Sequence, residues 1–290
     1  MNITLALGGG GVKGNAHIGV IRRLEIEGFK INSVAGTSFG GIVAVFHGLG
    51  YTPDEIEQMF IKVDQSQLFG RGANEGPSLL GLAGATRWLE SVIGARTFAD
   101  LNIPCAITAA DLKSGSEITL STGPLLDAIL ATIALPGIFP ARHIGEMELI
   151  DGGTLNPVPV APARLLSPKL PVIAVVLNLP MGFPAESWNI PLPDYIPHTV
   201  IERLSRLRYT RALDVFLRSI DLMTRAVNDY RLEADNPDVI IRPVVEDIDI
   251  LDRVDVREVV RRGEDAVDFM LPELKKLFAW QSRLRRAVGV

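Results

Sequence analysis

Two glycine-rich stretches near the N-terminus contain the residue types needed for nucleophilic catalysis. Residues 36–40 read G-T-S-F-G and fit G-x-S-x-G, the pattern of a sharp strand-to-helix turn that exposes a serine hydroxyl. Residues 8–14 read G-G-G-G-V-K-G, and small residues of this kind let several backbone N–H groups converge on an anion. One turn therefore predicts a nucleophile, Ser38, and the other predicts an oxyanion hole.

The segments around the two turns predict how they are brought together. Residues 3–7 and 33–35 are short apolar runs typical of strands, and each turn is followed by apolar residues at helical spacing. Two parallel strands that each turn into a helix end at the same edge of a sheet. That edge is where open α/β sheets bind their ligands.

The first turn also satisfies G-x-G-x-x-G, the dinucleotide-binding fingerprint. That fingerprint requires an acidic residue at the end of the second strand to bind the ribose, whereas Ser38 and its turn occupy this position here. A P-loop is excluded because Gly14 follows Lys13 where a serine or threonine is required. The loop is better suited to an oxyanion than to a diphosphate.

A serine nucleophile needs a base, and the sequence offers two kinds. No histidine lies in a recognisable base motif, so a Ser-His-Asp triad has no support; the four histidines are His17, His47, His143 and His198. Asp151 ends a predicted strand and precedes Gly152 and Gly153, which would let its backbone approach another loop closely. A carboxylate can act as the base if it reaches Ser38. By itself, Asp-Gly-Gly favours a simple turn.

Taken together, these motifs resemble the patatin-like phospholipase family. Residues 6–19, 35–41 and 133–159 carry the resemblance, and the third span contains A-L-P-G-I-F-P, then D-G-G, then N-P-V-P. Their order and spacing match the family, and the chain length is similar to that of its short bacterial members. The resemblance covers residues 1 to about 245.

The resemblance implies a role for each matching residue. Ser38 matches the nucleophile, and Asp151 matches the second member of a Ser–Asp dyad that uses no histidine. The loop that matches the oxyanion hole contains Gly9, Gly10, Gly11 and Lys13, with lysine where many members have arginine. The supporting motif positions are Gly14, Gly36, Gly40, Gly152 and Gly153. Family members hydrolyse acyl esters of phospholipids, lysophospholipids or simpler lipids, and the dyad chemistry needs no metal or cofactor.

The alternation of strand and helix patterns predicts an α/β fold with three α/β/α layers around a mostly parallel central sheet. We expect strands at residues 3–7, 33–35, 103–110, 116–120, 147–150, 172–177 and 239–242. We expect helices at residues 78–93, 125–134, 199–235, 256–271 and 273–288. A further helix is expected to begin at residue 53, with Thr52 as its N-cap and Glu55 completing a capping box. Residues 66–77 are expected to form a mobile loop which, with the helix after it, is either a pocket wall or an ordinary surface excursion. Residues 1–245 are expected to form the catalytic domain, and residues 246–290 to form C-terminal helices packed on it.

Composition narrows the function classes. With 47% hydrophobic residues among 290, the chain can bury a large core, and a net charge of −5 gives no reason to expect nucleic acid. The single cysteine, Cys105, excludes an intramolecular disulfide and is expected in a buried strand. Because no signal peptide or membrane span is recognised, a cytoplasmic location is expected. The arginines near residues 203–218 could contact the inner face of a membrane; a solvated surface or a homo-oligomer contact is the alternative.

The expected activity is that of a serine lipid acyl hydrolase acting on carboxylic esters. An acyltransferase or thioesterase would use the same serine, since water and other acceptors compete for one acyl-enzyme. A non-catalytic regulatory protein on this scaffold is a third alternative, although both members of the dyad are present. A nicotinamide-dependent enzyme is a distant fourth.

Overall fold

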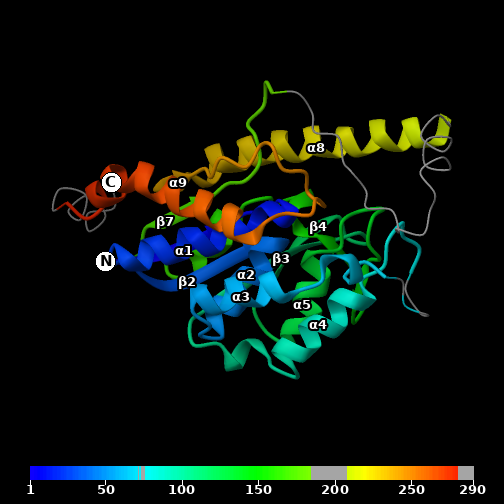
Figure 1. Cartoon of the computed structure of the whole chain (residues 1–290), viewed down its shortest axis with the longest axis horizontal. Helices are drawn as coiled ribbons and strands as arrows, with labels where there is room; N and C mark the ends of the chain where they lie inside the picture. Colours follow the sequence, from blue (N-terminus) through cyan, green and yellow to red (C-terminus); the bar gives the residue numbers. More distant parts are fainter. Residues whose placement is uncertain (71, 73–75, 184–207, 280–290) are drawn as a thin grey trace.

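The computed structural model describes residues 1–70, 72, 76–183 and 208–279 (Figure 1). The strands are β1 (Asn2–Leu7), β2 (Lys30–Thr37), β3 (Cys105–Asp111), β4 (Ser116–Leu120), β5 (Arg142–Ile144), β6 (Met147–Asp151), β7 (Val172–Val175) and β8 (Val239–Ile241). The helices are α1 (Ala16–Ile26), α2 (Phe39–Gly48), α3 (Pro53–Lys62), α4 (Ala83–Ile93), α5 (Leu125–Thr132), α6 (Val160–Leu166), α8 (Arg208–Asp235) and α9 (Val256–Lys276).

The described strands form one mixed sheet in the order β5-β6-β3-β2-β1-β7-β8, with β4 paired to β3. The pairs from β3 through β2, β1 and β7 to β8 are all parallel. Strands β4, β5 and β6 pair antiparallel at one end of the sheet. Leu7 is in register with Gly36, so β1 and β2 end at the same edge, and the expectation for the two glycine-rich turns is confirmed.

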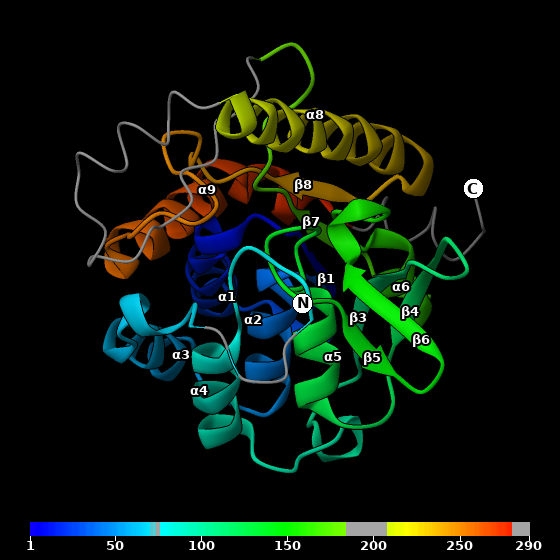
Figure 2. The ribbon, with the colours of Figure 1, turned by 90° about the vertical axis from the view of Figure 1, so that its right-hand side faces the viewer.

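Helices cover both faces of the sheet, as expected for a three-layer α/β/α fold (Figures 1 and 2). Along β1, Leu5 and Leu7 belong to the large core cluster shared with α1, α2 and α5, whereas Ala6 belongs to a smaller cluster on the opposite face. That second cluster is rich in alanine, and α6 packs against it. Small side chains there let α6 lie close to the strands, because a helix can approach only as near as the side chains between allow.

The register of β3 brings the ends of β2 and β6 together. Strand β4 pairs along one side of β3, from Ile107 to Asp111. On the other side, β2 pairs with the first part of β3 up to Thr108, and β6 pairs antiparallel with the continuation from Ala109. Strands β2 and β6 therefore meet end to end beside β3. Ser38 follows directly after β2 and Asp151 ends β6, so the two residues become neighbours although 113 positions separate them in the sequence.

Three predicted helices differ from the structure. The helix expected from residue 78 begins at Ala83, because Leu79 and Leu80 instead donate backbone hydrogen bonds to Gly137 and Ile138. The two closing helices expected on either side of Pro272 are one helix, α9. Helix α9 packs along α1 so closely that a Cβ on Gly263 would lie 2.0 Å from the carbonyl oxygen of Ala16, and this packing outweighs the hydrogen bond lost at the proline.

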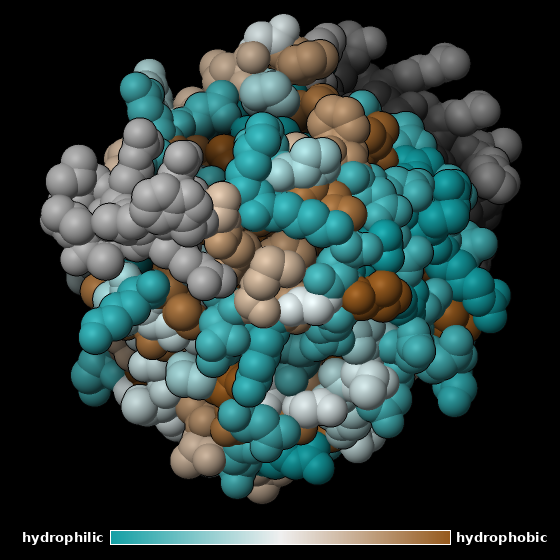
Figure 3. Space-filling model, turned by 90° about the vertical axis from the view of Figure 1, so that its left-hand side faces the viewer, coloured by the Kyte–Doolittle hydropathy of each residue, from teal (hydrophilic) through white to brown (hydrophobic). Residues whose placement is uncertain are grey.

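Several predictions fall partly outside the described residues: the loop at 66–77, the start of the helix at 199–235 and the end of the chain after residue 279. Within the described helices, no stretch is long and apolar enough to cross a membrane. On the face shown in Figure 3, hydrophilic side chains predominate and apolar ones are interspersed among them.

Cys105 is buried in β3 as expected, and burial raises the pKa of its thiol to about 12.

Candidate active site

Ser38 lies on a strained turn between β2 and α2. Its backbone has φ 54° and ψ −128°, a conformation that residues with a side chain rarely adopt. A Cβ on Gly36 would lie 2.4 Å from the carbonyl oxygen of Gly40, and one on Gly40 would lie 2.3 Å from that of Leu7. Neither position therefore has room for a side chain, which explains why both are glycine. The Ser38 N–H donates a hydrogen bond of 2.7 Å to Thr132 Oγ1, which fixes the turn to α5.

The first glycine-rich loop presents two N–H groups beside this serine. The Gly9 N–H donates to the Pro157 carbonyl at 2.9 Å and is thereby occupied. The N–H groups of Gly10 and Gly11 make no hydrogen bond within the described part of the chain. Gly11 has φ 58°, and a Cβ there would lie 2.1 Å from the Ile250 carbonyl oxygen. Only glycine fits at this position. Of the four residues predicted to form the oxyanion-hole loop, Gly10 and Gly11 have N–H groups available.

Two buried basic residues, His17 of α1 and Lys13 of this loop, do not line the pocket. His17 Nε2 lies 2.7 Å from the Gly8 carbonyl and must donate to it, because a carbonyl oxygen only accepts. Burial lowers the pKa of His17 to about 4, so the ring is neutral and holds the loop in position. The Lys13 side chain is also buried and is absent from the pocket lining. The pKa of Asp247 is lowered mainly by its hydrogen bond to Arg262 and further by the charge of Lys13.

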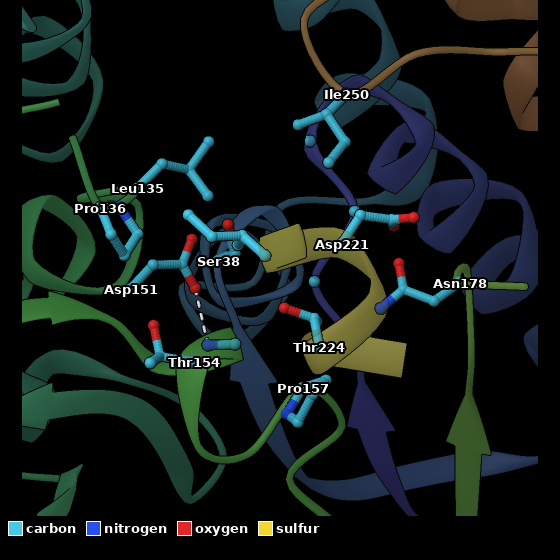
Figure 4. A pocket seen from close by; sticks show the side chains of 15 residues that line it. Ser38, Leu135, Pro136, Asp151, Thr154, Pro157, Asn178, Asp221, Thr224 and Ile250 are labelled. Carbon is cyan, nitrogen blue, oxygen red and sulfur yellow. Dashed lines mark hydrogen bonds between the residues drawn. The ribbon is translucent and has the colours of Figure 1, made fainter. Parts of the chain in front are cut away.

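The Asp151 carboxyl lies beside Ser38 and is 2% exposed (Figure 4). Its Oδ1 accepts the Gly153 N–H at 2.7 Å, while Oδ2 is buried and has no hydrogen bond of standard geometry from any described residue. Burial raises the pKa of Asp151 from 3.8 to about 6, although the Ser38 hydroxyl and the Gly153 N–H each lower it. A carboxyl with such a pKa, next to a serine hydroxyl, is suited to proton transfer near neutral pH.

A pocket of about 530 Å³, measured out to its mouth, contains both groups. Its lining includes the following predicted residues: Gly9, Gly10, Gly11, Ser38, Asp151 and Gly153. The other predicted glycines act through close packing instead. A Cβ on Gly14 would lie 2.3 Å from the Phe39 ring, and one on Gly152 would lie 2.5 Å from the Thr108 carbonyl oxygen.

Among the alternative bases, the three histidines in the described part of the chain do not line the pocket. His17 is tied to the glycine loop, and His47 is buried with its pKa lowered by burial to about 4. His143 is an exposed residue of β5, and His198 lies outside the described residues. None of the described residues of the 66–93 region lines the pocket, so of the two alternatives for that region the surface excursion fits better than the pocket wall.

A polar network fixes the segment after Asp151. The Thr37 hydroxyl donates to the Asn156 carbonyl at 3.0 Å, which ties the residue before Ser38 to this segment. The Asn156 amide donates to Glu117 at 2.8 Å, and Arg231 of α8 donates to the same carboxylate at 2.8 Å. Arg231 also donates to the carbonyl of Leu155 at 3.2 Å. Through Arg231, helix α8 is thus connected to the segment that follows Asp151, and that segment is bonded to Thr37, the residue before Ser38.

Five pocket residues outside the recognised motif spans were missed by the sequence reasoning: Asn178, Ile220, Asp221, Thr224 and Ile250. Asn178 follows β7, a parallel neighbour of β1, so its location at the ligand-binding edge could have been inferred from strand order. Asp221 and Thr224 lie on α8, where the sequence pattern shows only an apolar stripe. Ile250 lies beyond the expected domain boundary at residue 245. For the residues of α8 and for Ile250, no local signal in the sequence indicates that they lie over the pocket.

Comparisons with known proteins agree with this fold. The model of the patatin-like phospholipase family matches residues 5–164, more than half of the chain. An uncharacterized NTE family protein of Mycobacterium tuberculosis is 35% identical over 215 residues, which cover 73% of this chain and 57% of that protein. The uncharacterized protein YqhO of Bacillus subtilis is 32% identical over 211 residues, covering 61% of this chain and 72% of YqhO.

Among solved structures, the crystal structure of VipD from Legionella pneumophila has a similar fold. The TM-score is 0.57 at 12% identity, and the match covers 94% of this chain and 66% of VipD. This likeness concerns the fold alone. The chain spans little more than half the length of the mycobacterial relative. From the family match over residues 5–164, the chain belongs to the patatin-like phospholipase family.

Proposed function

We propose that this protein hydrolyses carboxylic esters of acyl lipids through an acyl-enzyme formed on Ser38. The observation that carries the proposal is the pair of Ser38 and the buried Asp151, whose pKa is raised by burial to about 6. Both line one pocket with the unbonded N–H groups of Gly10 and Gly11. Membership of a family of lipid acyl hydrolases supports the same activity.

In the first step, Asp151 takes the proton of the Ser38 hydroxyl while the serine oxygen attacks the ester carbonyl. Since Asp151 Oδ1 accepts the Gly153 N–H, Oδ2 is the atom that receives the proton. The N–H groups of Gly10 and Gly11 stabilise the negative charge on the former carbonyl oxygen. When the tetrahedral intermediate collapses, the alcohol leaves with the proton from Asp151, and the acyl group stays on Ser38.

In the second step, water replaces the serine hydroxyl as the nucleophile. Asp151 accepts a proton from water, hydroxide attacks the acyl-enzyme, and the same two N–H groups bind the new oxyanion. Collapse returns the proton to Ser38 and releases the fatty acid. The strained turn at Ser38 and its hydrogen bond to Thr132 hold the serine oxygen in a fixed position throughout.

The test is hydrolysis of p-nitrophenyl esters of increasing acyl length, with product analysis for free fatty acid. We expect Ser38→Ala and Asp151→Asn each to lower kcat by on the order of a thousandfold or more. Ser91→Ala, which removes an exposed hydroxyl on α4, is the matched control and should keep full activity. Full activity of folded Asp151→Asn would refute the dyad. Transfer of the acyl group to an added alcohol, without free acid, would refute hydrolysis.

A further inference from the structure

The pocket lining is mixed, with Thr154 near Pro136 and Ile250 near Asp221, but its polar side chains are gathered mainly on one side of Ser38 (Figure 4). Leu135 and Pro136 lie on one side of Ser38. On the other side, Asn178, Asp221 and Thr224 gather, the last two from α8. The two halves of an acyl ester differ in the same way, because the acyl chain is apolar and the alcohol carries the polar groups. The polar side therefore has the chemistry of a binding site for the alcohol half.

The Asp221 carboxylate on this side of the pocket forms an ion pair with Arg225. Its Oδ2 lies 2.8 Å from Arg225 Nη2, and its Oδ1 accepts the Arg225 Nε–H at 3.1 Å. The pair is buried, with side-chain exposures of 1% for Arg225 and 8% for Asp221. Asp221 lines the pocket and Arg225 does not. Both carboxylate oxygens are held by Arg225, so Asp221 is the pocket-side member of a buried ion pair.

We propose that this polar wall, consisting of Asn178, Asp221 and Thr224, binds an uncharged alcohol that carries free hydroxyl groups, such as glycerol, and discriminates against an anionic phosphate. The inference rests on the proposed esterase activity of Ser38. A hydroxyl donates to the Asp221 carboxylate, and the Thr224 hydroxyl and Asn178 amide each donate and accept. A phosphate monoester at the same position has only acceptor oxygens and negative charge facing Asp221, so it is repelled.

The experiment compares two water-soluble esters with the same acyl group, 1-butyrylglycerol and 1-butyrylglycerol 3-phosphate. A third ester, p-nitrophenyl butyrate, reports the Ser38 chemistry without a polyol. For the wild type we expect kcat/KM at least about tenfold higher for 1-butyrylglycerol than for its phosphate. Asp221→Asn should reduce that ratio to about threefold or less. Thr224→Val should lower kcat/KM for 1-butyrylglycerol severalfold more than it lowers kcat/KM for p-nitrophenyl butyrate.

The matched control is Asp265→Asn. It breaks the ion pair between Arg261 and Asp265 of α9, which has the same i,i+4 spacing, and both side chains of this pair are 63% exposed. Asp265→Asn should leave kcat/KM for all three esters unchanged, and with it the ratio of kcat/KM between 1-butyrylglycerol and its phosphate. Equal rates on the two glycerol esters in the wild type would overturn the inference. So would an unchanged ratio in an Asp221→Asn variant that still hydrolyses p-nitrophenyl butyrate. If Asp221→Asn does not fold, an undiminished 1-butyrylglycerol rate in Thr224→Val is the overturning result. A wild type inactive on all three esters refutes the proposed function itself, and the inference with it.

Discussion

Replacing Asp151 by asparagine removes a buried carboxylate and should stabilise the fold while it abolishes activity. The pKa of Asp151 is raised from 3.8 to about 6 by burial. A shift of this size corresponds to about 3 kcal/mol of folding free energy, at 1.36 kcal/mol per unit. Below pH 3.8 both states are protonated and the penalty is absent. Between pH 3.8 and 6 the unfolded chain releases the proton that the folded chain keeps, so the penalty grows, and above pH 6 it is complete.

Asparagine is uncharged, has the same shape, and can still accept the Gly153 N–H through its side-chain oxygen. We therefore expect the free energy of unfolding of Asp151→Asn to exceed that of the wild type by about 1 kcal/mol at pH 4.5 and by about 3 kcal/mol at pH 8. Urea denaturation of both proteins at the two pH values measures this difference. Asp265→Asn, at an exposed site, should change stability by less than about 1 kcal/mol at either pH.

The reasoning is refuted if Asp151→Asn is no more stable than the wild type at pH 8, or if its advantage does not grow between pH 4.5 and pH 8. Either result would mean that the native carboxylate is solvated better than its burial indicates. The same charge that is unfavourable for folding is the one that the proposed reaction needs, so stability and activity should change in opposite directions.

Three further predictions concern the same site. Because Asp151 must be ionised to accept a proton, kcat/KM should fall about tenfold per pH unit below about pH 6, and a profile flat to pH 5 would contradict its role. Gly11→Ala should lower kcat at least about a hundredfold in a p-nitrophenyl ester assay by displacing an oxyanion donor. Gly94→Ala, at a similar φ of 62° with open space around it, should not. Glu117→Gln should weaken the hydrogen bond from the Asn156 amide and lower kcat about tenfold with little change in KM. A tenfold rise in KM would instead indicate a general loss of structure.

The parts of the fold that local sequence determines were predicted closely. The antiparallel strand at 116–120 matches β4 residue for residue, because alternation and flanking turns are contained in the segment itself. The capping box formed by Thr52 and Glu55 is present, since it requires only residues three positions apart. The two glycine-rich turns and Asp151 were recognised for the same reason.

What the sequence could not indicate depends on contacts between distant segments. Nothing near Asp221 or Ile250 shows that they cover a pocket built by the first 160 residues, because their location follows from how the chain after β7 packs. The Gly9 N–H was predicted to bind the oxyanion, but its partner, the Pro157 carbonyl, lies almost 150 positions away. The continuation of α9 through Pro272 likewise depends on packing against α1.

The most direct test of the central claim is to label the nucleophile covalently. The protein is incubated with a fluorophosphonate that carries an alkyl chain, digested, and analysed by mass spectrometry to locate the adduct. The account predicts one adduct per chain, on Ser38, with labelling lost in Ser38→Ala, slowed strongly in Asp151→Asn and unchanged in Ser91→Ala. An adduct on another residue, or labelling of Ser38 at the wild-type rate without Asp151, would contradict a Ser38–Asp151 dyad.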